Sequence, residues 1–132
     1  MFKQICDSIF RLYLYADNTK KIHYTTDSNH MHELCDKLRD TIIDFTDEFA
    51  EQSFGYYGKP KYGDFQSLSK LSIEETDDLN EICDRVVGIV ALFGTEFKND
   101  DKLSGIVSLI DDFKGKINQI KFLCTFDKFS KR

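Results

Sequence analysis

Apolar residues recur three or four positions apart in four separate segments of the chain, with polar residues between them. This spacing places the apolar side chains on one face of a helix. It predicts four helices, over residues of about 2–24, 29–53, 73–97 and 101–125. The second segment has the most regular apolar stripe, which consists of Met31, Leu34, Cys35, Leu38, Ile42, Phe45 and Phe49. The pattern therefore predicts an all-α protein.

Residues that can cap helices mark the expected helix ends. The polar stretch of residues 25–29 offers Asp27 or Ser28 as the N-cap of the second helix. Ser72 and Glu75 have the spacing of a capping box, in which each side chain accepts a hydrogen bond from the backbone N–H of the other. This pair predicts that the third helix begins there.

Between Ser53 and Leu71 the helical pattern fails, and the sequence SFGYYGKPKYGDF contains three glycines, the only proline and five aromatic residues. A segment of this length is long for a loop in a compact domain. We expect it to cross the molecule, packed down by its own tyrosines and phenylalanines, with one short helical turn. The three connections are thus short, long and short. This order is typical of a ferritin-like four-helix bundle with a long crossover between helices 2 and 3.

Composition limits the class of protein. The 132 residues suit a single domain, residues 1–132, and a content of 41% hydrophobic residues can form a core without disulfides. A net charge of −5 at pH 7 argues against general nucleic-acid binding. The sequence has no apolar run of about 18 residues that would span a membrane, and its first residues lack the apolar region of a signal peptide. We therefore expect a cytoplasmic protein.

The four cysteines, Cys6, Cys35, Cys83 and Cys124, lie one in each expected helix, on or beside the apolar stripe. Metal-binding fingers and redox motifs need closely spaced cysteines, and the sequence has no C-x-x-C pair. This distribution predicts reduced cysteines that pack in the core, rather than disulfides.

The expected second helix carries side chains that can bind a metal, opposite its apolar stripe. His32 and Asp36 lie one turn apart on this outer face, and so do Asp47 and Glu51. The two pairs are separated by eleven residues, or about 16 Å at the standard helical rise. One ion therefore cannot bridge both pairs within a single chain.

Two apolar residues, Ile43 and Ala50, lie among these polar side chains and indicate a contact surface for a partner. A second copy, antiparallel across a two-fold axis near Ile42 and Ile43, would bring the two pairs together. The dimer would then contain two identical sites, each with one imidazole and three carboxylates. Donors of this kind suit Fe(II), Mn(II) or Zn(II).

The four residues of these two pairs form the sequence H-x3-D-x10-D-x3-E. This sequence resembles the ferroxidase motif of the Dps-type mini-ferritins, and the surrounding HELCDKLRD and DEFAE resemble the second helix of that family. His23 and Tyr24 form an HY pair near the end of the expected first helix, where the family has an HW pair. Small Dps-like proteins encoded by bacteriophages are also similar, including a stretch rich in glycine and tyrosine after the second helix.

The resemblance implies a di-iron centre between two subunits, where hydrogen peroxide oxidises Fe(II), and a hollow cage of subunits that stores the product. Zn or Mn would be substitutes for Fe. The implied ligands are His23, His32, Asp36, Asp47 and Glu51. The gap between the first two histidines is nine residues where the family has twelve, and His30 is the alternative to His23. The alternative function is that of a Dps-like bundle with an inactive centre, which binds an unidentified protein partner.

Overall fold

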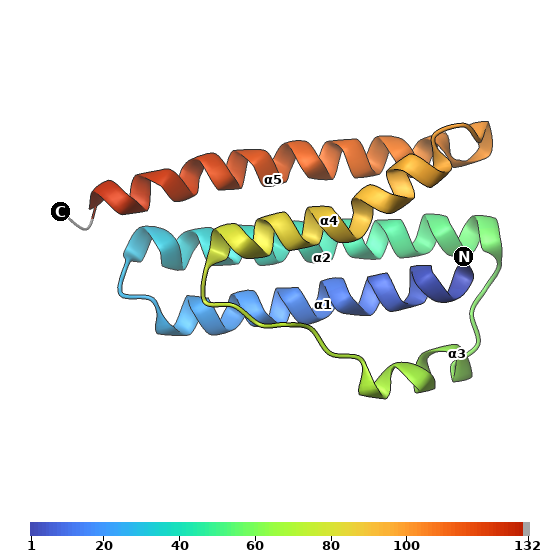
Figure 1. Cartoon of the computed structure of the whole chain (residues 1–132), viewed down its shortest axis with the longest axis horizontal. Coiled ribbons are helices and arrows are strands. Elements are labelled where there is room, and N and C mark those ends of the chain that lie inside the picture. The colour runs from blue at the N-terminus through green and yellow to red at the C-terminus, as the bar shows by residue number, and fades with distance from the viewer. Residues whose placement is uncertain (131–132) are drawn as a thin grey trace.

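The computed structural model describes residues 1–130, except for the side chains of residues 67, 69 and 127–130, and its regular structure is entirely helical (Figure 1). The elements are α1 (Phe2–Thr25), α2 (Asn29–Tyr57), α3 (Gly63–Gln66), the 3₁₀ helix η1 (Ser67–Lys70), α4 (Leu79–Phe97), the 3₁₀ helix η2 (Asp101–Leu103) and α5 (Ser104–Ser130). The prediction of an all-α protein is confirmed for these residues. None of the helices that the structure describes combines the length and the apolar character needed to cross a membrane.

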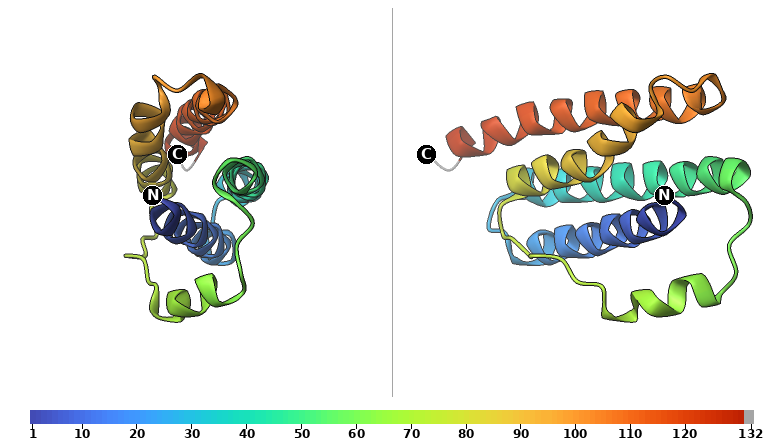
Figure 2. Two further views of the ribbon diagram at one scale, coloured as in Figure 1. Left: turned by 90° about the vertical axis from the view of Figure 1, so that its right-hand side faces the viewer. Right: turned by 45° about the vertical axis from the view of Figure 1, so that its right-hand side comes forward.

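The four long helices lie side by side along the molecule (Figures 1 and 2). α1 packs antiparallel to α2 and α4 packs antiparallel to α5, and the two pairs meet where α5 contacts α2 and α4 contacts α1. Residues 58–78 leave α2 at one end of the molecule and return to the other end, so α2 and α4 run in the same direction (Figure 1). The turn between α1 and α2 and the start of α4 therefore lie at the same end.

The predicted apolar stripes form the core. In α2 the buried apolar side chains are Leu34, Cys35, Leu38, Ile42, Phe45 and Phe49, as predicted, whereas Met31 is half-buried. Aromatic rings connect the helices. Phe45 stacks on Phe113 of α5 with the ring centroids 4.1 Å apart, and Phe49 contacts Phe93 of α4 at 5.5 Å. Removing these side chains from water is the main favourable contribution to folding.

The second and fourth helices are longer than predicted. α2 continues past residue 53 to Tyr57, and Phe54 in this extra turn packs on Phe2 of α1 with ring centroids 5.9 Å apart. The helix ends at Gly58, whose φ of 114° is accessible to glycine but not to residues with a side chain. The fourth predicted helix begins at residue 101 as η2, and α5 continues past residue 125 to Ser130.

One predicted N-cap is confirmed and another is wrong. The Ser28 hydroxyl accepts a hydrogen bond of 3.1 Å from a backbone N–H in the first turn of α2. The predicted capping box of Ser72 and Glu75 does not form, because α4 begins at Leu79. Its N-cap is Asp78, whose Oδ1 accepts a hydrogen bond of 2.9 Å from an N–H in the first turn.

Contacts with α1 keep residues 71–78 out of the helix. Asn18 is buried, and its Nδ2 donates to the Thr76 carbonyl at 2.9 Å while its Oδ1 accepts from the Thr76 N–H at 3.0 Å. Arg11 donates to the Ser72 carbonyl at 3.1 Å. These bonds occupy backbone groups that an earlier helix start would need, so tertiary contacts override the local capping signal.

The crossover contains the short helical turn that the sequence predicts, in the form of α3 and η1. Its aromatic residues pack only in part. Phe65 contacts Phe10 of α1, with ring centroids 5.3 Å apart, whereas Tyr62 is 82% exposed.

The four cysteines are buried thiols, in agreement with the prediction. Burial raises the pKa of Cys35 and of Cys83 to about 12. Because the thiolate is the nucleophilic form of cysteine, these two side chains act as small apolar groups of the core.

Truncation of the stacked pair of Phe45 and Phe113 tests this core. Phe113 is 2% exposed, and we expect Phe113→Ala to lower the free energy of unfolding by about 3–5 kcal/mol, because it leaves a cavity between α2 and α5. The matched control is Tyr62→Ala on the exposed crossover, which should change this free energy by less than about 0.5 kcal/mol. Urea denaturation followed by circular dichroism measures both. Equal effects of the two substitutions would contradict this assignment of the core.

Candidate metal centre

Two histidines hold the turn between α1 and α2 together. His23 Nδ1 donates to the His32 carbonyl oxygen at 2.9 Å, and His32 Nδ1 donates to the His23 carbonyl oxygen at 2.9 Å. The two rings stack with centroids 3.7 Å apart. A carbonyl oxygen only accepts hydrogen bonds, so each Nδ1 carries a hydrogen and each neutral ring keeps its lone pair on Nε2. We call His23 and His32 the histidine clasp.

Asp36 adds a carboxylate to the histidine clasp, one turn after His32. Its Oδ1 lies 3.3 Å from His23 Nδ1 and 3.2 Å from Lys20 Nζ. The hydrogen bond from Lys20 lowers the pKa of Asp36 below its ordinary value, and positive charge on the two imidazoles acts in the same direction. Asp36 is therefore ionised at neutral pH, and 51% of its side chain is exposed.

Lys20 is a residue of this cluster that the sequence analysis missed. Besides its bond to Asp36, its Nζ lies 5.3 Å from the centroid of the Tyr24 ring. Lys20 precedes His23 by three residues, so both lie on one side of α1. Its approach to Asp36 depends on how α1 crosses α2, which residue spacing does not specify. A metal ion bound to Asp36 would compete with this ion pair.

Asp47 and Glu51 lie farther along α2 and do not join the histidine clasp of their own chain. Both are exposed, and Asp47 follows Asp36 by eleven residues, or about 16 Å of helix. Their neighbour is Tyr13 of α1. Desolvation and the negative charges of Asp47 and Glu51 raise the pKa of the Tyr13 phenol. Among the side chains of one chain that the structure describes, no three of His, Cys, Asp or Glu are grouped to hold a metal ion.

The outer surface of α2 is less exposed than predicted. Ile43 and Ala50, which the sequence places at the centre of a contact surface, are half-buried against the core. His32 and Asp36 lie against α1 through their contacts with His23 and Lys20. The part of the α2 surface that a partner could contact is therefore smaller than the sequence predicted.

His30, the alternative to His23, has a different neighbour. Its Nε2 donates to the Leu123 carbonyl of α5 at 2.7 Å, so this nitrogen carries a hydrogen instead of a lone pair. His30 therefore ties α2 to α5 and adds no ligand to the histidine clasp.

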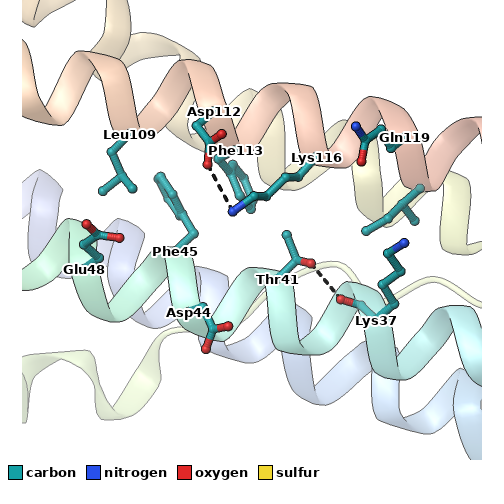
Figure 3. A pocket seen from close by; sticks show the side chains of 11 residues that line it. Lys37, Thr41, Asp44, Phe45, Glu48, Leu109, Asp112, Phe113, Lys116 and Gln119 are labelled. Carbon is teal, nitrogen blue, oxygen red and sulfur yellow. Dashed lines mark hydrogen bonds and ion pairs between the residues drawn. The ribbon is translucent and has the colours of Figure 1, made fainter.

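α2 and α5 form a groove of about 310 Å³, which the sequence did not indicate (Figure 3). Its wall includes the Phe45 ring, and Asp44 and Glu48 lie along its edge. These two carboxylates are spaced one turn apart, like Asp47 and Glu51, on the same helix. They therefore provide a matched control for substitutions at the candidate metal ligands.

A protein-family model matches residues 23–123, and its description is a family of unknown function, DUF5856. The matched range includes all the candidate ligands, which are His23, His32, Asp36, Asp47 and Glu51. Comparisons with curated proteins and with solved structures give no match.

The histidine clasp predicts the tautomers of the three histidines. At a pH where the rings are neutral, His23 and His32 should carry their hydrogen on Nδ1, because each Nδ1 faces a carbonyl oxygen. His30 should carry it on Nε2, which faces the Leu123 carbonyl. Long-range ¹H–¹⁵N correlation spectra distinguish the two forms. An Nε2–H tautomer at His23 or His32 would show that the clasp does not form in solution.

Proposed function

The chain belongs to the DUF5856 family, and we propose that it is a Dps-like, ferritin-like protein that binds Fe(II) between two subunits and oxidises it with hydrogen peroxide. The proposed role is protection of the cytoplasm against peroxide. The observation that carries the proposal is the histidine clasp, in which both Nδ1 atoms face carbonyl oxygens, so that His23 and His32 each keep a lone pair on Nε2. The Asp36 carboxylate lies on the Nδ1 side of the clasp, 3.3 Å from His23 Nδ1.

The direction of the helices supports a ferritin-like bundle. A connection that runs the length of the molecule makes the helices before and after it parallel, as α2 and α4 are (Figure 1). A four-helix bundle with one such crossover is the ferritin-like arrangement.

The hydrogen bonds of the histidine clasp support a role in metal binding. A histidine that binds a metal through one ring nitrogen usually donates the N–H of the other to a carbonyl or carboxylate oxygen, which fixes the ring. His23 and His32 make this second bond to backbone carbonyls, and Asp36 lies 3.3 Å from His23 Nδ1. Imidazole and carboxylate donors together fit Fe(II), with Zn(II) and Mn(II) as substitutes.

A second subunit would complete the donor set. A two-fold axis near Ile42 and Ile43 would place Asp47 and Glu51 of one subunit near His32 and Asp36 of the other. The proposed dimer is isologous and has two equivalent sites.

Iron is the substrate of this reaction. Two Fe(II) ions each lose one electron to one molecule of hydrogen peroxide, which takes up two protons and leaves as two water molecules. The carboxylates of Asp36, Asp47 and Glu51 would hold the cations, and the clasp would orient the imidazoles. Lys20 would have to release Asp36 when iron binds.

Substitution of the acidic pair tests iron binding. In an anaerobic Fe(II) titration, Asp47→Asn with Glu51→Gln should remove binding, because each proposed site loses two of its three carboxylates. Asp44→Asn with Glu48→Gln makes the same change of charge at the groove between α2 and α5, and it should leave binding intact. Addition of peroxide, followed by the absorbance of Fe(III), then measures oxidation.

Absence of binding by the wild-type chain at micromolar Fe(II) would reject the ferroxidase function. The alternative of an inactive Dps-like bundle that binds a protein partner would then take its place. Equal losses in the two double variants would instead indicate general electrostatic attraction of Fe(II), and would also contradict the proposed site.

The site also predicts that metal promotes association. Without a cation the carboxylates repel one another across the two-fold axis, so Zn(II) or a lower pH should increase the association of subunits. Light scattering coupled to gel filtration, with and without Zn(II), measures this increase. The variant with Asp47→Asn and Glu51→Gln should show no response to Zn(II). A wild-type chain whose mass does not change with Zn(II) would refute the intersubunit site.

A further inference from the structure

The middle of α4 carries no charged side chain on any side. Residues 86–95 carry no charge, and Val86, Val90 and Phe93 point into the core. On the outside, Leu92 is 53% exposed and Ile89 is half-buried. A helical segment that is apolar on its outer side as well as on its inner side is ordinarily covered on both sides. The exposed side of α4 therefore has the character of a contact surface.

Charged residues flank this apolar segment in a regular stripe. Arg85, Ile89, Leu92 and Glu96 follow one another at intervals of four, three and four residues, which places them along one line of the helix. We call these four residues the α4 stripe. Its centre is apolar, and its two ends have opposite charges. Gly88 lies beside it. Apart from its chain neighbours and the nearby backbone of α4, no heavy atom lies within 4 Å of the place where its Cβ would be, so a side chain from a partner can approach closely.

We propose that the α4 stripe binds the α4 stripe of a second copy of this chain, antiparallel across a two-fold axis between Ile89 and Leu92. In this register Ile89 faces the partner's Leu92, and Arg85 faces the partner's Glu96. Every contact occurs twice, as a two-fold interface requires. The charges pair only in the antiparallel orientation, because parallel stripes would place Arg85 on Arg85 and Glu96 on Glu96.

Two bonds within the chain fix the Arg85 guanidinium at one end of the α4 stripe. Its Nη1 donates to the Glu74 carbonyl at 2.5 Å, and its Nη2 lies 3.4 Å from Glu81 Oε2. The guanidinium has five N–H donors, so it can donate to a further carboxylate. Because these bonds restrict the side chain before association, its ordering costs less when the partner binds.

This interface differs from the proposed metal-dependent interface in two ways, which are its place in the fold and its independence of a cation. The α4 stripe lies on another helix than Asp47 and Glu51, and its contacts need no cation. Association through α4 therefore persists in EDTA, and either interface can fail in experiment without the other.

Sedimentation equilibrium in EDTA, at protein concentrations from about 5 to about 300 μM, tests the proposal in a range that brackets micromolar affinity. The wild-type chain should pass from monomer to dimer. Leu92→Glu should weaken dimerisation at least about tenfold, because it places a charge at the centre of the contact. Phe122→Glu is the matched control, since Phe122 is 63% exposed on α5, and it should leave dimerisation unchanged.

Charge reversal tests the register. Arg85→Glu and Glu96→Arg should each weaken dimerisation, because each brings like charges together at both ends of the interface. The double variant should recover most of the wild-type affinity, as coupled pairs do in a double-mutant cycle. Circular dichroism of each variant checks that the helices are intact.

Three results would overturn the proposal. A wild-type chain that stays monomeric in EDTA over the whole range would exclude the interface. Dissociation by Phe122→Glu but not by Leu92→Glu would place the contact near α5 instead. Failure of the double variant to recover, although its helices are intact, would exclude the antiparallel register.

Discussion

Residues 58–78 have to carry the chain along the length of the molecule before α4 can begin, and the rest of the fold depends on this path. Because the chain returns to the end where α2 started, α2 and α4 run in the same direction (Figure 1). The two antiparallel pairs can then meet through α2–α5 and α1–α4 contacts. Asn18 and Arg11 hold the returning segment against α1 by bonds to its backbone. A short connection would have made α2 and α4 antiparallel neighbours and would have buried other faces.

The helices could be predicted from the sequence because each long helix buries one face in the core. The residues of that face are apolar and recur three or four positions apart, so the spacing is visible in the sequence. The helix ends that were missed depend on distant residues. Thr76 bonds to Asn18, which lies 58 positions earlier, and no local pattern contains that contact. Phe54 similarly extends α2 through its contact with Phe2 of α1, although the neighbouring glycines and tyrosines resemble a loop.

The candidate site, too, could be predicted only in part. The one-turn spacings of His32 with Asp36 and of Asp47 with Glu51 follow from the helix alone, and the sequence identified them. The histidine clasp depends on how residues 26–28 set α1 against α2. The nine-residue gap between His23 and His32 states only their separation along the chain, so the reciprocal bonds to backbone carbonyls could not be predicted. The bond from Lys20 to Asp36 depends on the same crossing of helices.

The burial of the cysteine thiols affects how readily the molecule is oxidised. Damage to cysteine starts from the thiolate and proceeds through sulfenic acid to forms that cells cannot readily restore. Burial raises the pKa of Cys35 and of Cys83 to about 12, so both thiols are protonated at neutral pH, and both lie in the core. Neither condition for this damage is therefore met at these two residues. If the chain handles peroxide as proposed, the oxidant would encounter iron at the interface between subunits before it reached the sulfur atoms of the core. These two thiols would then stay unmodified through many rounds of reaction.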